Sequence, residues 1–413
     1  MTKKVLALLF CFSLSGCALA RIDPLHLLVR SDRITSLEQE AEILSRASLG
    51  WTKDGRIRVL VTRGNAYERG YQQGKLLRHE VQDNLGYIHK RALKKFHFEE
   101  LFNEVYERMR PFIPQDYVDE MHGLAHGSRL PLEVIHHIHV LADIGEWGGK
   151  KHIKKAIREM MAGTLATTCS NLSASGSATS DGELYTVRIL DWGLHRISKL
   201  HEYPLIHISI PDKGLTNVNI GWVGYLGAIS GMNAEGITLG EMGYRDPEGE
   251  TLQGIPMPFM LRQVLTEASN LEDVRRIIRD AVGTNSYIFM MSDGKSKESE
   301  LYVKDRQRFL SFKPGADIRD TQDYLPAIAD IVYGGHYNEK MTKVLNENHG
   351  QLSPELLQRI IPQIAMPSNF QNVIYRPQKL QFWVSNAASS DDWAASQPYT
   401  FFDLAEFLAN NRH

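Results

Sequence analysis

The feature that most constrains the fold is a change in apolar periodicity near Thr168. Between Leu37 and Val140, apolar residues recur at three- and four-residue spacing, as in "FEELFNEVYERM", which predicts mainly helices. After Thr168, short runs rich in β-branched and aromatic residues alternate with Gly and Asn, which predicts strands. Only Pro258–Ala268 and Asn270–Ala281 interrupt these strands as predicted helices, the second with Asn270 as its N-cap. We therefore expect a helix-rich segment followed by a β-rich one.

The first twenty residues, "MTKKVLALLFCFSLSGCALA", have the pattern of a bacterial lipoprotein signal. Two lysines precede a short apolar run, and Leu14–Cys17 resembles a lipobox. We expect residues 1–16 to be removed and Cys17 to carry lipid; an ordinary signal peptide with a chance cysteine is the alternative. With Ala18 after Cys17, we expect the outer membrane in a Gram-negative cell. No later segment reaches 18 apolar residues without a charge, so we expect an anchored body in the cell envelope.

The composition and charge of the chain are those of a globular protein of enzyme size. Hydrophobic residues make up 43% and charged residues 23%, enough for a large core. Lys and Arg number 47 against 49 Asp and Glu, so nothing suggests a nucleic-acid partner. A basic stretch, Gly148–Glu159, suits an exposed linker. We expect a helical segment at 17–168 that ends in this linker, a β-rich segment at 169–413, and one compact unit formed by both.

Cys169 stands where the two patterns meet. With Cys11 in the signal and Cys17 lipidated, it is left without a disulfide partner, so it is either a reactive thiol or a small core residue. The turn signal "TSDG" predicts a hairpin whose register sets Cys169 opposite Trp192 and beside Asp191. Arg188 would lie roughly 10 Å along a regular strand and on its other face, so both could reach Cys169 only if that strand is bulged or bent.

Four segments together resemble a known enzyme family. "TTCSNLSASGSATSDGELYTVRILDW" (Thr167–Trp192) is similar to the nucleophile segment of the acyl-coenzyme A:6-aminopenicillanic acid acyltransferase-like family of autoproteolytic N-terminal nucleophile (Ntn) cysteine hydrolases, which are related to bile salt hydrolase, penicillin V acylase and acid ceramidase. Gly64–Leu77, Ser230–Gly243 and Asn372–Ala387 resemble further segments in the family's order. The resemblance implies a four-layer αββα sandwich, with two antiparallel sheets face to face and helices outside.

The resemblance also implies that the precursor cuts itself between Thr168 and Cys169. The thiol would attack the preceding carbonyl, and the new α-amino group would then act as its base, since their pKa values lie near 8 and 8.5. Arg188 would favour the thiolate, and Asp191 would orient the α-ammonium. A strand-end salt bridge between Arg188 and Asp191 is the structural alternative. The two fragments should stay associated.

Further site residues are assigned by the same resemblance. Asn285 is similar to the asparagine that polarises the scissile carbonyl. Where some relatives carry a second asparagine, this chain has Gly240 or Glu241, so a backbone N–H or a Glu241 contact with the new amine is possible. For Asn233 we favour the interpretation as a turn residue over a contact with the oxyanion. Two interpretations of Ser368–Asn372 remain: it lines the pocket, or it forms the turn that leads into a strand.

The expected activity is hydrolysis of a small acyl amide through a thioester acyl-enzyme, with no cofactor and no metal. His122 and His126 have i, i+4 metal spacing, yet no HExxH motif accompanies them, which favours ordinary helix histidines. The first alternative is an acyltransferase that moves the acyl group from a thioester to an amine. An alternative of another class is a binding lipoprotein that no longer reacts.

Overall fold

The computed structural model describes residues 34, 36–90, 99–146, 169–193, 198–244, 251–319, 324–335, 338–389 and 391–411. The chain divides into two compact units, Met1–Glu40 and Ala41–His413, and both sheets belong to the second. The expected signal peptide, Cys17, the basic linker and Thr168 lie outside the described residues. No helix in these described ranges is long and apolar enough to cross a membrane.

The larger sheet has nine strands, and it takes strands from both segments of the chain. In spatial order they are β1 (Ser48–Trp51), β2 (Arg58–Gly64), β5 (Pro204–Pro211), β6 (Asn217–Trp222), β7 (Gly231–Asn233), β8 (Ile237–Gly243), β9 (Tyr287–Asp293), β10 (Glu298–Lys304) and β11 (Phe309–Phe312). Its pairs are antiparallel except β2 with β5, which run parallel. The expectation of purely antiparallel sheets was therefore wrong here. A parallel pair needs a long crossover, and most of the helical segment lies between these strands.

The second sheet has six antiparallel strands and contains the hairpin that begins at Cys169. In spatial order they are β12 (Ile331–Gly335), β3 (Ser170–Ala174), β4 (Tyr185–Leu190), β13 (Gln371–Arg376), β14 (Gln381–Asn386) and β15 (Thr400–Asp403). Its β3 and β4 pack against β8 and β9 of the larger sheet. A hydrogen bond between the hydroxyls of Thr186 in β4 and Ser292 in β9 bridges the two sheets there, and Ser292 also accepts from Thr238 of β8.

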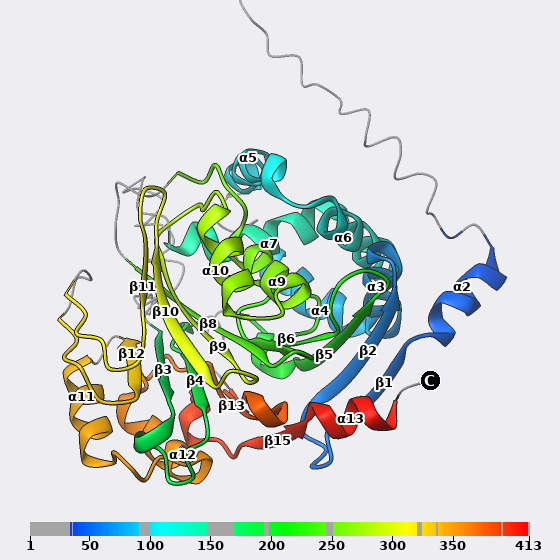
Figure 1. The fold of residues 1–413 in the computed structure, drawn as a ribbon. Coiled ribbons are helices and arrows are strands. Elements are labelled where there is room, and N and C mark those ends of the chain that lie inside the picture. Colours follow the sequence, from blue (N-terminus) through cyan, green and yellow to red (C-terminus); the bar gives the residue numbers. More distant parts are fainter. Residues whose placement is uncertain are drawn as a thin grey trace, which may run out of the picture. The chain divides into compact units, whose positions relative to one another are not determined.

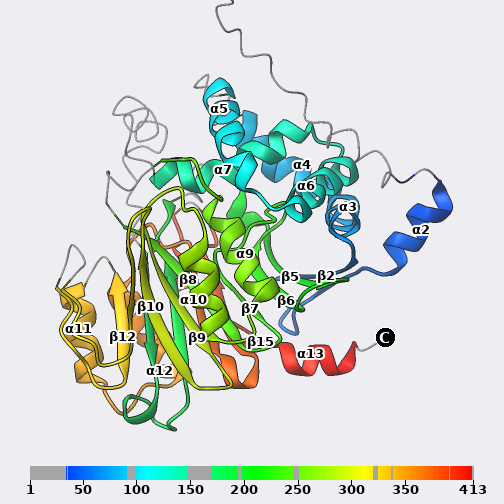
Figure 2. The same cartoon turned by 45° about the horizontal axis from the view of Figure 1, so that its top comes forward.

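Helices cover both outer faces, so the predicted four-layer αββα class is confirmed (Figure 1). The helices are α2 (Leu37–Ser45), α3 (Ala66–Leu76), α4 (Arg78–Ile88), α5 (Glu99–Met109), α6 (Gln115–Ser128), α7 (Leu132–Glu146), α9 (Met257–Glu267), α10 (Leu271–Asp280), α11 (Asn338–Glu347), α12 (Pro354–Ile364) and α13 (Leu404–Asn410). Helices α9 and α10 pack on the larger sheet, and α11 and α12 lie on the side of the smaller one. Figure 2 shows α4, α6 and α7 grouped above β2, β5 and β6.

The two interrupting helices form as predicted, and the Asn270 side chain accepts a 3.0 Å hydrogen bond from the Asp273 amide. The prediction that no other helix follows Thr168 was wrong, because α11, α12 and α13 also form. The start of α12 carries an ordinary signal, since Ser353 caps it and Pro354 is its first residue.

Helices α3 and α6 pack backbone to backbone through glycines. A Cβ at Gly70 would lie 2.0 Å from the Glu120 carbonyl oxygen, and one at Gly123 would lie 2.0 Å from that of Tyr67. Gly74 and Gly127 repeat the contact one turn later. Any larger residue would separate the helices, so these two pairs of glycines set their approach.

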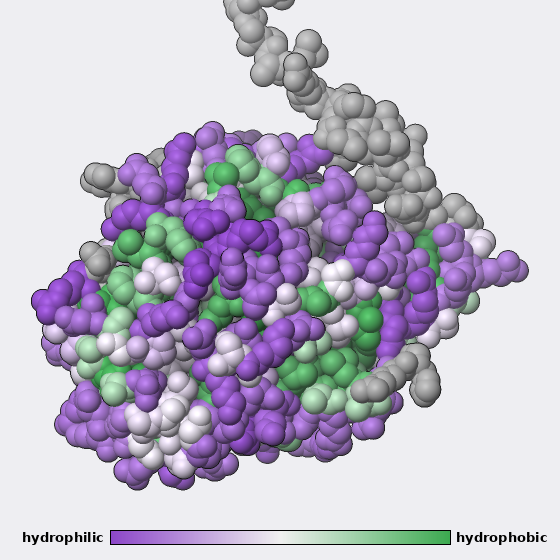
Figure 3. Space-filling view, in the orientation of Figure 1, coloured by the Kyte–Doolittle hydropathy of each residue, from purple (hydrophilic) through white to green (hydrophobic). Residues whose placement is uncertain are grey.

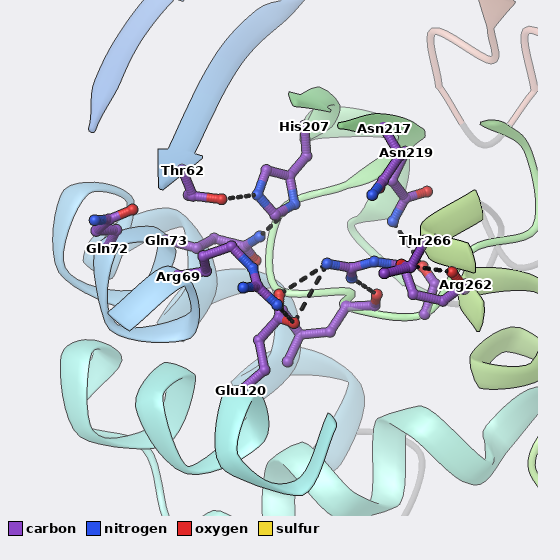
Figure 4. A network of polar contacts seen from close by, with 12 residues as sticks. Thr62, Arg69, Gln72, Gln73, Glu120, His207, Asn217, Asn219, Arg262 and Thr266 are labelled. Atoms are coloured by element: carbon purple, nitrogen blue, oxygen red, sulfur yellow. Dashed lines mark hydrogen bonds and ion pairs between the residues drawn. The ribbon is translucent and has the colours of Figure 1, made fainter. Parts of the chain in front are cut away.

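This close approach places Glu120 in a buried polar network (Figure 4). Arg69 of α3 and Arg262 of α9 both donate to its carboxylate, at 3.3 and 3.0 Å. Nearby, His207 of β5 contacts the Thr62 hydroxyl at 2.8 Å. Burial, helped by Arg262, lowers the pKa of His207 to about 3, so its ring is neutral. Two guanidinium groups thus share one carboxylate, and they come from both sides of Cys169 in the sequence.

The face of the molecule in Figure 3 mixes small apolar areas with hydrophilic side chains. Among the described residues of the larger unit, these large apolar side chains are exposed: Trp51, Phe112, Val282, Tyr324 and Phe401. They are scattered along the sequence, as is usual for single surface residues.

Candidate active site

Cys169 is the residue directly before β3, at the start of the smaller sheet's hairpin. In the observed register Ser170 pairs with Ile189, so continuing it sets Cys169 opposite Leu190. The predicted register, with Cys169 opposite Trp192, was wrong by two residues. The strands stop at Ala174 and Tyr185, and residues 175–184 connect them in place of a tight four-residue turn. The shift brings Arg188 two residues closer to Cys169.

The Cys169 thiol is free and buried, with 5% of the residue exposed. Burial raises the pKa of the thiol to about 12, and the positive charge of the neighbouring Arg188 opposes that rise. The carboxylates of Glu241 and Asp191 raise it further. In the uncut chain the thiol is therefore protonated, next to the cation that would stabilise its anion.

Arg188 of β4 is fully buried, and it donates a 2.6 Å hydrogen bond from Nη2 to Glu241 Oε1. Burial by itself lowers the pKa of Arg188, but interactions with the thiolate form of Cys169 and with the Glu241 carboxylate more than compensate, so its pKa lies above the usual value. Burial also raises the pKa of Glu241, and Arg188 opposes this. The ion partner of Arg188 is thus Glu241 of the other sheet, and the alternative of an Arg188–Asp191 salt bridge does not form.

Gly240 gives Arg188 room to reach Glu241. A Cβ at Gly240 would lie 2.4 Å from Asn171 Oδ1 and 3.1 Å from Arg188 Cδ. Since side chains alternate along a strand, Gly240 faces the smaller sheet and Glu241 faces away from it. Arg188 contacts both Gly240 and Glu241 because Gly240 has no side chain to block the arginine.

Asp191 follows β4 directly, where the chain has left the regular strand. Its Oδ1 accepts from the Met366 amide at 3.2 Å and from Asn369 Nδ2 at 3.0 Å. Its Oδ2 is buried without a partner in the part of the chain that the structure describes. Burial raises the pKa of Asp191 to about 7, and these two donors lower it only in part. Asn369 belongs to Ser368–Asn372, so this segment supports the carboxylate.

Asn285 lies in the loop before β9 and is 1% exposed. Its Nδ2 donates to the main-chain oxygen of Asp143 at 2.8 Å and to Tyr287 Oη at 3.3 Å. Asp143 of α7 is buried, and its carboxylate accepts from Thr284 Oγ1. Burial raises the pKa of Asp143 to about 7. Asn285 is therefore held by the helical segment that precedes Cys169.

Asn233 is the last residue of β7, directly before the turn to β8. Its Oδ1 accepts from the amides of Glu235 and Ile237 at 3.1 and 3.0 Å, and its Nδ2 donates to Leu265 and Ala268 carbonyls. These four contacts account for both polar atoms of the side chain.

The histidines of α7 take part in the packing of the helical layer. The His136 ring stacks on Tyr106 with centroids 3.7 Å apart, and His139 Nε2 accepts from the Leu226 amide at 2.8 Å. Across the described ranges, no group of three His, Cys, Asp or Glu residues could hold a metal ion.

Asn171 is a candidate that the sequence reasoning missed. It is fully buried, pairs across the hairpin with Arg188, and has no partner for either amide atom among the residues described here. Its signal in the sequence is a polar residue two places after Cys169, on the same face of the strand. Reading that signal requires the correct register.

The structure thus brings Cys169, Arg188, Gly240 and Glu241 together at the contact of the two sheets. Asp191 is near enough for its charge to act on the thiol. The arrangement can generate a thiolate beside a fixed cation. Asp191 Oδ2, which has no partner among the described residues, is available for a positive group.

Comparisons with known proteins add relatives of low identity. No family model matches the chain. It is 23% identical over 393 residues to Protein dcd1A of Dictyostelium discoideum, covering 84% of this chain and 82% of that protein. It is 24% identical over 261 residues to an uncharacterized protein of Archaeoglobus fulgidus, covering 57% of this chain and 41% of that protein, so the chain spans less than half of its length.

Solved structures with similar folds include three enzymes. A mutant of conjugated bile acid hydrolase from Clostridium perfringens aligns over 58% of this chain and 93% of its own, with a TM-score of 0.36 and 12% identity. The Caenorhabditis elegans orthologue of N-acylethanolamine-hydrolyzing acid amidase aligns over 57% of this chain and 100% of its own, with a TM-score of 0.42 and 10% identity. Penicillin V acylase from Agrobacterium tumefaciens aligns over 58% of this chain and 87% of its own, with a TM-score of 0.35 and 11% identity. Similarity of this extent concerns the fold at most.

Proposed function

We propose that this chain is an N-terminal nucleophile cysteine amidase, made active by cleavage of its own Thr168–Cys169 bond. The observation that carries the proposal is the buried Cys169 thiol, on which the Arg188 charge acts, with Arg188 held in place by the Glu241 carboxylate. The αββα layers agree with the fold that the sequence resemblance implies. Asp191 Oδ2, which has no partner within the described ranges, provides an acceptor for the ammonium group that cleavage would create.

Activation would proceed in two steps. The Cys169 sulfur attacks the Thr168 carbonyl carbon, a C–S bond forms and the C–N bond breaks, and the nitrogen takes a proton to become the free amine of Cys169. Water then hydrolyses this thioester and leaves Thr168 with a carboxyl terminus and Cys169 with a thiol. Arg188 stabilises the sulfur anion in both steps.

The mature enzyme would use its own α-amino group as the base. The amine takes the thiol proton, the thiolate attacks the substrate carbonyl carbon, and the same proton passes to the leaving nitrogen. Water then attacks the acyl thioester, which releases a carboxylic acid and regenerates the thiol. Asp191 accepts a hydrogen bond from the ammonium and orients it.

The proposed substrate is a small acyl amide, with a lipid-like amide favoured by the expected membrane anchor. The alternative is transfer of the acyl group to an amine in place of water, which needs the same residues. Adding an amine acceptor to the assay separates the two, since an acyltransferase then forms a new amide. A binding lipoprotein without turnover is the alternative of another class.

The proposed location is the outer surface of a membrane, through lipid on Cys17. Cys17→Ser should release the protein into the soluble fraction while leaving its fold unchanged. Wild-type protein that already fractionates as soluble would contradict the anchor.

Denaturing electrophoresis with N-terminal sequencing tests the cleavage directly. Wild type should give fragments of about 17 and about 28 kDa, scaled from 46.9 kDa for 413 residues, and the larger should begin at Cys169. Cys169→Ala should leave one inactive chain, whereas Ser170→Ala, the neighbouring change in β3, should still be cut. Wild type that stays whole yet hydrolyses amides would refute the mechanism. Wild type that stays whole and inert would favour the binding protein.

A further inference from the structure

The chain that leads into β13 is bonded to the end of β4, opposite Cys169. The Phe370 amide donates to the main-chain oxygen of Leu190 at 2.7 Å. Continuing the observed hairpin register sets Leu190 opposite Cys169, and Asp191 is the next residue. Opposite residues of an antiparallel pair have Cα atoms about 4.5–5.5 Å apart. Whatever holds Leu190 and Asp191 thus acts directly across from the nucleophile and from the nitrogen that self-cleavage would free.

One turn, at residues 366–369, supplies two donors to Asp191. The Asn369 amide closes this turn on the Met366 carbonyl at 2.9 Å. The Met366 amide and Asn369 Nδ2 then donate to the same carboxylate oxygen, Oδ1, at 3.2 and 3.0 Å. Asp191 Oδ2 receives neither, and it has no partner among the residues that the structure describes. The carboxylate is thus fixed through one oxygen, and the other is left for a further donor.

The orientation of the Asn369 side chain is fixed by its surroundings. Besides Asp191 Oδ1, its Nδ2 lies 3.3 Å from the main-chain oxygen of Leu190, which can only accept. Two hydrogen bonds, of 2.9 and 2.8 Å, join its amide group to that of Asn372 in β13. Both asparagines are fully buried, and the Asn372 amide lies 3.2 Å from Ser385 Oγ of β14. Nδ2 of Asn369 therefore faces the carboxylate, and Asn372 prevents the side chain from turning away.

The main chain around Asn369 is also constrained. The Asn369 carbonyl oxygen accepts from the Ala394 amide at 3.0 Å, and the Phe370 carbonyl oxygen accepts from the Ala387 amide at 2.9 Å. The Phe370 ring stacks on Trp222 of β6, with the ring centroids 4.5 Å apart. The turn is thus bonded to one sheet and packed against the other, so its two donors hold a fixed position relative to Asp191.

The charge of Asp191 depends on these donors. Burial raises the pKa of Asp191 to about 7, and the Met366 and Asn369 donors and the charge of Arg188 oppose that rise. Among the described residues, the ionisable groups that interact with Asp191 are Arg188 and Cys169. A hydrogen bond to a carboxylate favours its ionised form, and burial without one favours the protonated form. Near neutral pH, the loss of one donor should therefore change the charge of Asp191.

We propose that Asn369, held by Asn372, is the positioning residue that keeps Asp191 ionised and leaves its Oδ2 to the α-ammonium group of mature Cys169. Without the Asn369 donor, Asp191 takes up a proton and no longer orients the amine. The proposal rests on the proposed function, since only the cleaved chain has this ammonium group. It adds that the turn at residues 366–369 sets the pH range in which the base is oriented. Asn369 itself contacts neither the substrate nor the reacting atoms.

NMR of the uncut Cys169→Ala chain tests the effect on Asp191 without any substrate. The carboxyl carbon of Asp191, observed with isotope-labelled aspartate and identified by its loss in Asp191→Asn, should titrate at about pH 7. Asn369→Ala should raise this midpoint by about one pH unit, because a donor to the charged form is lost. Asn369→Asp, which keeps the size of the side chain, should raise it further, because two neighbouring carboxylates hold a proton more tightly. An unchanged or lower midpoint in folded Asn369→Ala would overturn the proposal.

Kinetics of the mature enzyme test the consequence for the reaction. With a fatty acyl amide of 7-amino-4-methylcoumarin as a fluorogenic probe, Asn369→Ala should lower kcat by up to about 10-fold at pH 6 and by less than about threefold at pH 9, where Asp191 is ionised again. KM should change little, because Asn369 does not contact the substrate. Asn372→Ala should give a smaller loss with the same pH dependence, since it frees the Asn369 amide to turn. A loss of equal size at every pH would show that Asn369 is only structural, and would overturn its positioning role.

Asn219→Ala is the matched control. Asn219 of β6 is also buried, and its Nδ2 donates to the main-chain oxygen of Gly227 at 2.7 Å. Its loss should lower the free energy of unfolding without changing the Asp191 midpoint or the pH dependence of kcat. If wild type shows no Cys169-dependent turnover, the proposed function itself fails, whatever the NMR titration gives. Turnover that depends on Cys169, together with an Asp191 midpoint that Asn369 does not move, refutes this inference alone.

Discussion

Replacing Glu241 by Gln should make the Cys169 thiol more reactive, although it removes a charged residue of the site. Glu241 Oε1 lies 2.6 Å from Arg188 Nη2, and this guanidinium opposes the rise in the pKa of Glu241 that burial causes. The carboxylate offsets the positive charge that the thiol would otherwise feel, and it raises the pKa of Cys169. Glutamine keeps an oxygen for Arg188 and removes the negative charge.

The expected size follows from the charge removed. A nearby charge shifts a pKa by about 1 to 3 units, and below the pKa each unit lost gives about tenfold more thiolate. A thiolate of lower pKa is also less nucleophilic, which cancels about half of the gain on a logarithmic scale. Alkylation of Cys169 at fixed pH should therefore accelerate about 3-fold to 30-fold. Breaking a buried ion pair costs about 3–5 kcal/mol, and the retained hydrogen bond should reduce that cost.

The assay is the rate of iodoacetamide labelling between pH 6 and pH 10, followed by mass spectrometry of the Cys169 peptide. Glu300→Gln is the control, because Glu300 forms a pair of equal length, 2.6 Å, with Arg275. It should lower the free energy of unfolding without changing the labelling rate. Slower or unchanged labelling in folded Glu241→Gln would refute the assignment of Glu241 as the group that holds the thiol pKa up.

Three further outcomes follow from contacts at glycines and at one carboxyl group. Gly240→Ala would set a Cβ 2.4 Å from Asn171 Oδ1, and it should slow both self-cleavage and amide turnover by at least about tenfold in gel and fluorescence assays. Gly123→Ala should lower the free energy of unfolding in urea by about 1–3 kcal/mol, while Gly86→Ala, which meets nothing within 4 Å, should raise it by up to about 1 kcal/mol. Burial raises the pKa of Asp191 to about 7 in the folded chain, so the stability from its bound proton is complete below about pH 4 and is lost as pH rises through 7. In an uncut chain Asp191→Asn should therefore stabilise more at pH 8 than at pH 4, by up to about 4 kcal/mol in urea unfolding.

Local patterns were enough to predict much of the fold. The β-rich character after Thr168 and the Asn270 cap are properties of neighbouring residues, and both predictions were confirmed. The signal for α12, Ser353 followed by Pro354, was present and was overlooked. The parallel pairing of β2 with β5 joins residues about 150 apart in sequence, and no periodicity encodes which distant strands pair.

In the candidate site, too, some residues could be predicted from the local sequence and others depend on how distant segments pack. The residues around Cys169 resemble the family closely enough to select Arg188 and Asp191, and in the structure the charges of both act on the Cys169 thiol. Which carboxylate pairs with Arg188 depends on how two sheets pack, and Glu241 lies 53 residues away in the chain. The same holds for Asn171, whose position opposite Arg188 depends on a hairpin register that the turn signal alone gave incorrectly.

The contacts across position 169 argue that self-cleavage would not release the preceding segment. Glu120, fully buried, binds Arg262 of the later segment at 3.0 Å, and Asp143 holds Asn285 of the same later segment at 2.8 Å. Separating the fragments would expose or unpair each of these groups, and breaking one buried ion pair alone costs about 3–5 kcal/mol. A cut at Thr168 changes none of these partners, because it removes one peptide bond and leaves the surrounding contacts unchanged. The helical segment would then remain as a structural part of the mature site, since it supplies the main-chain oxygen that orients Asn285. A propeptide whose only role was to block the thiol would need no such contact.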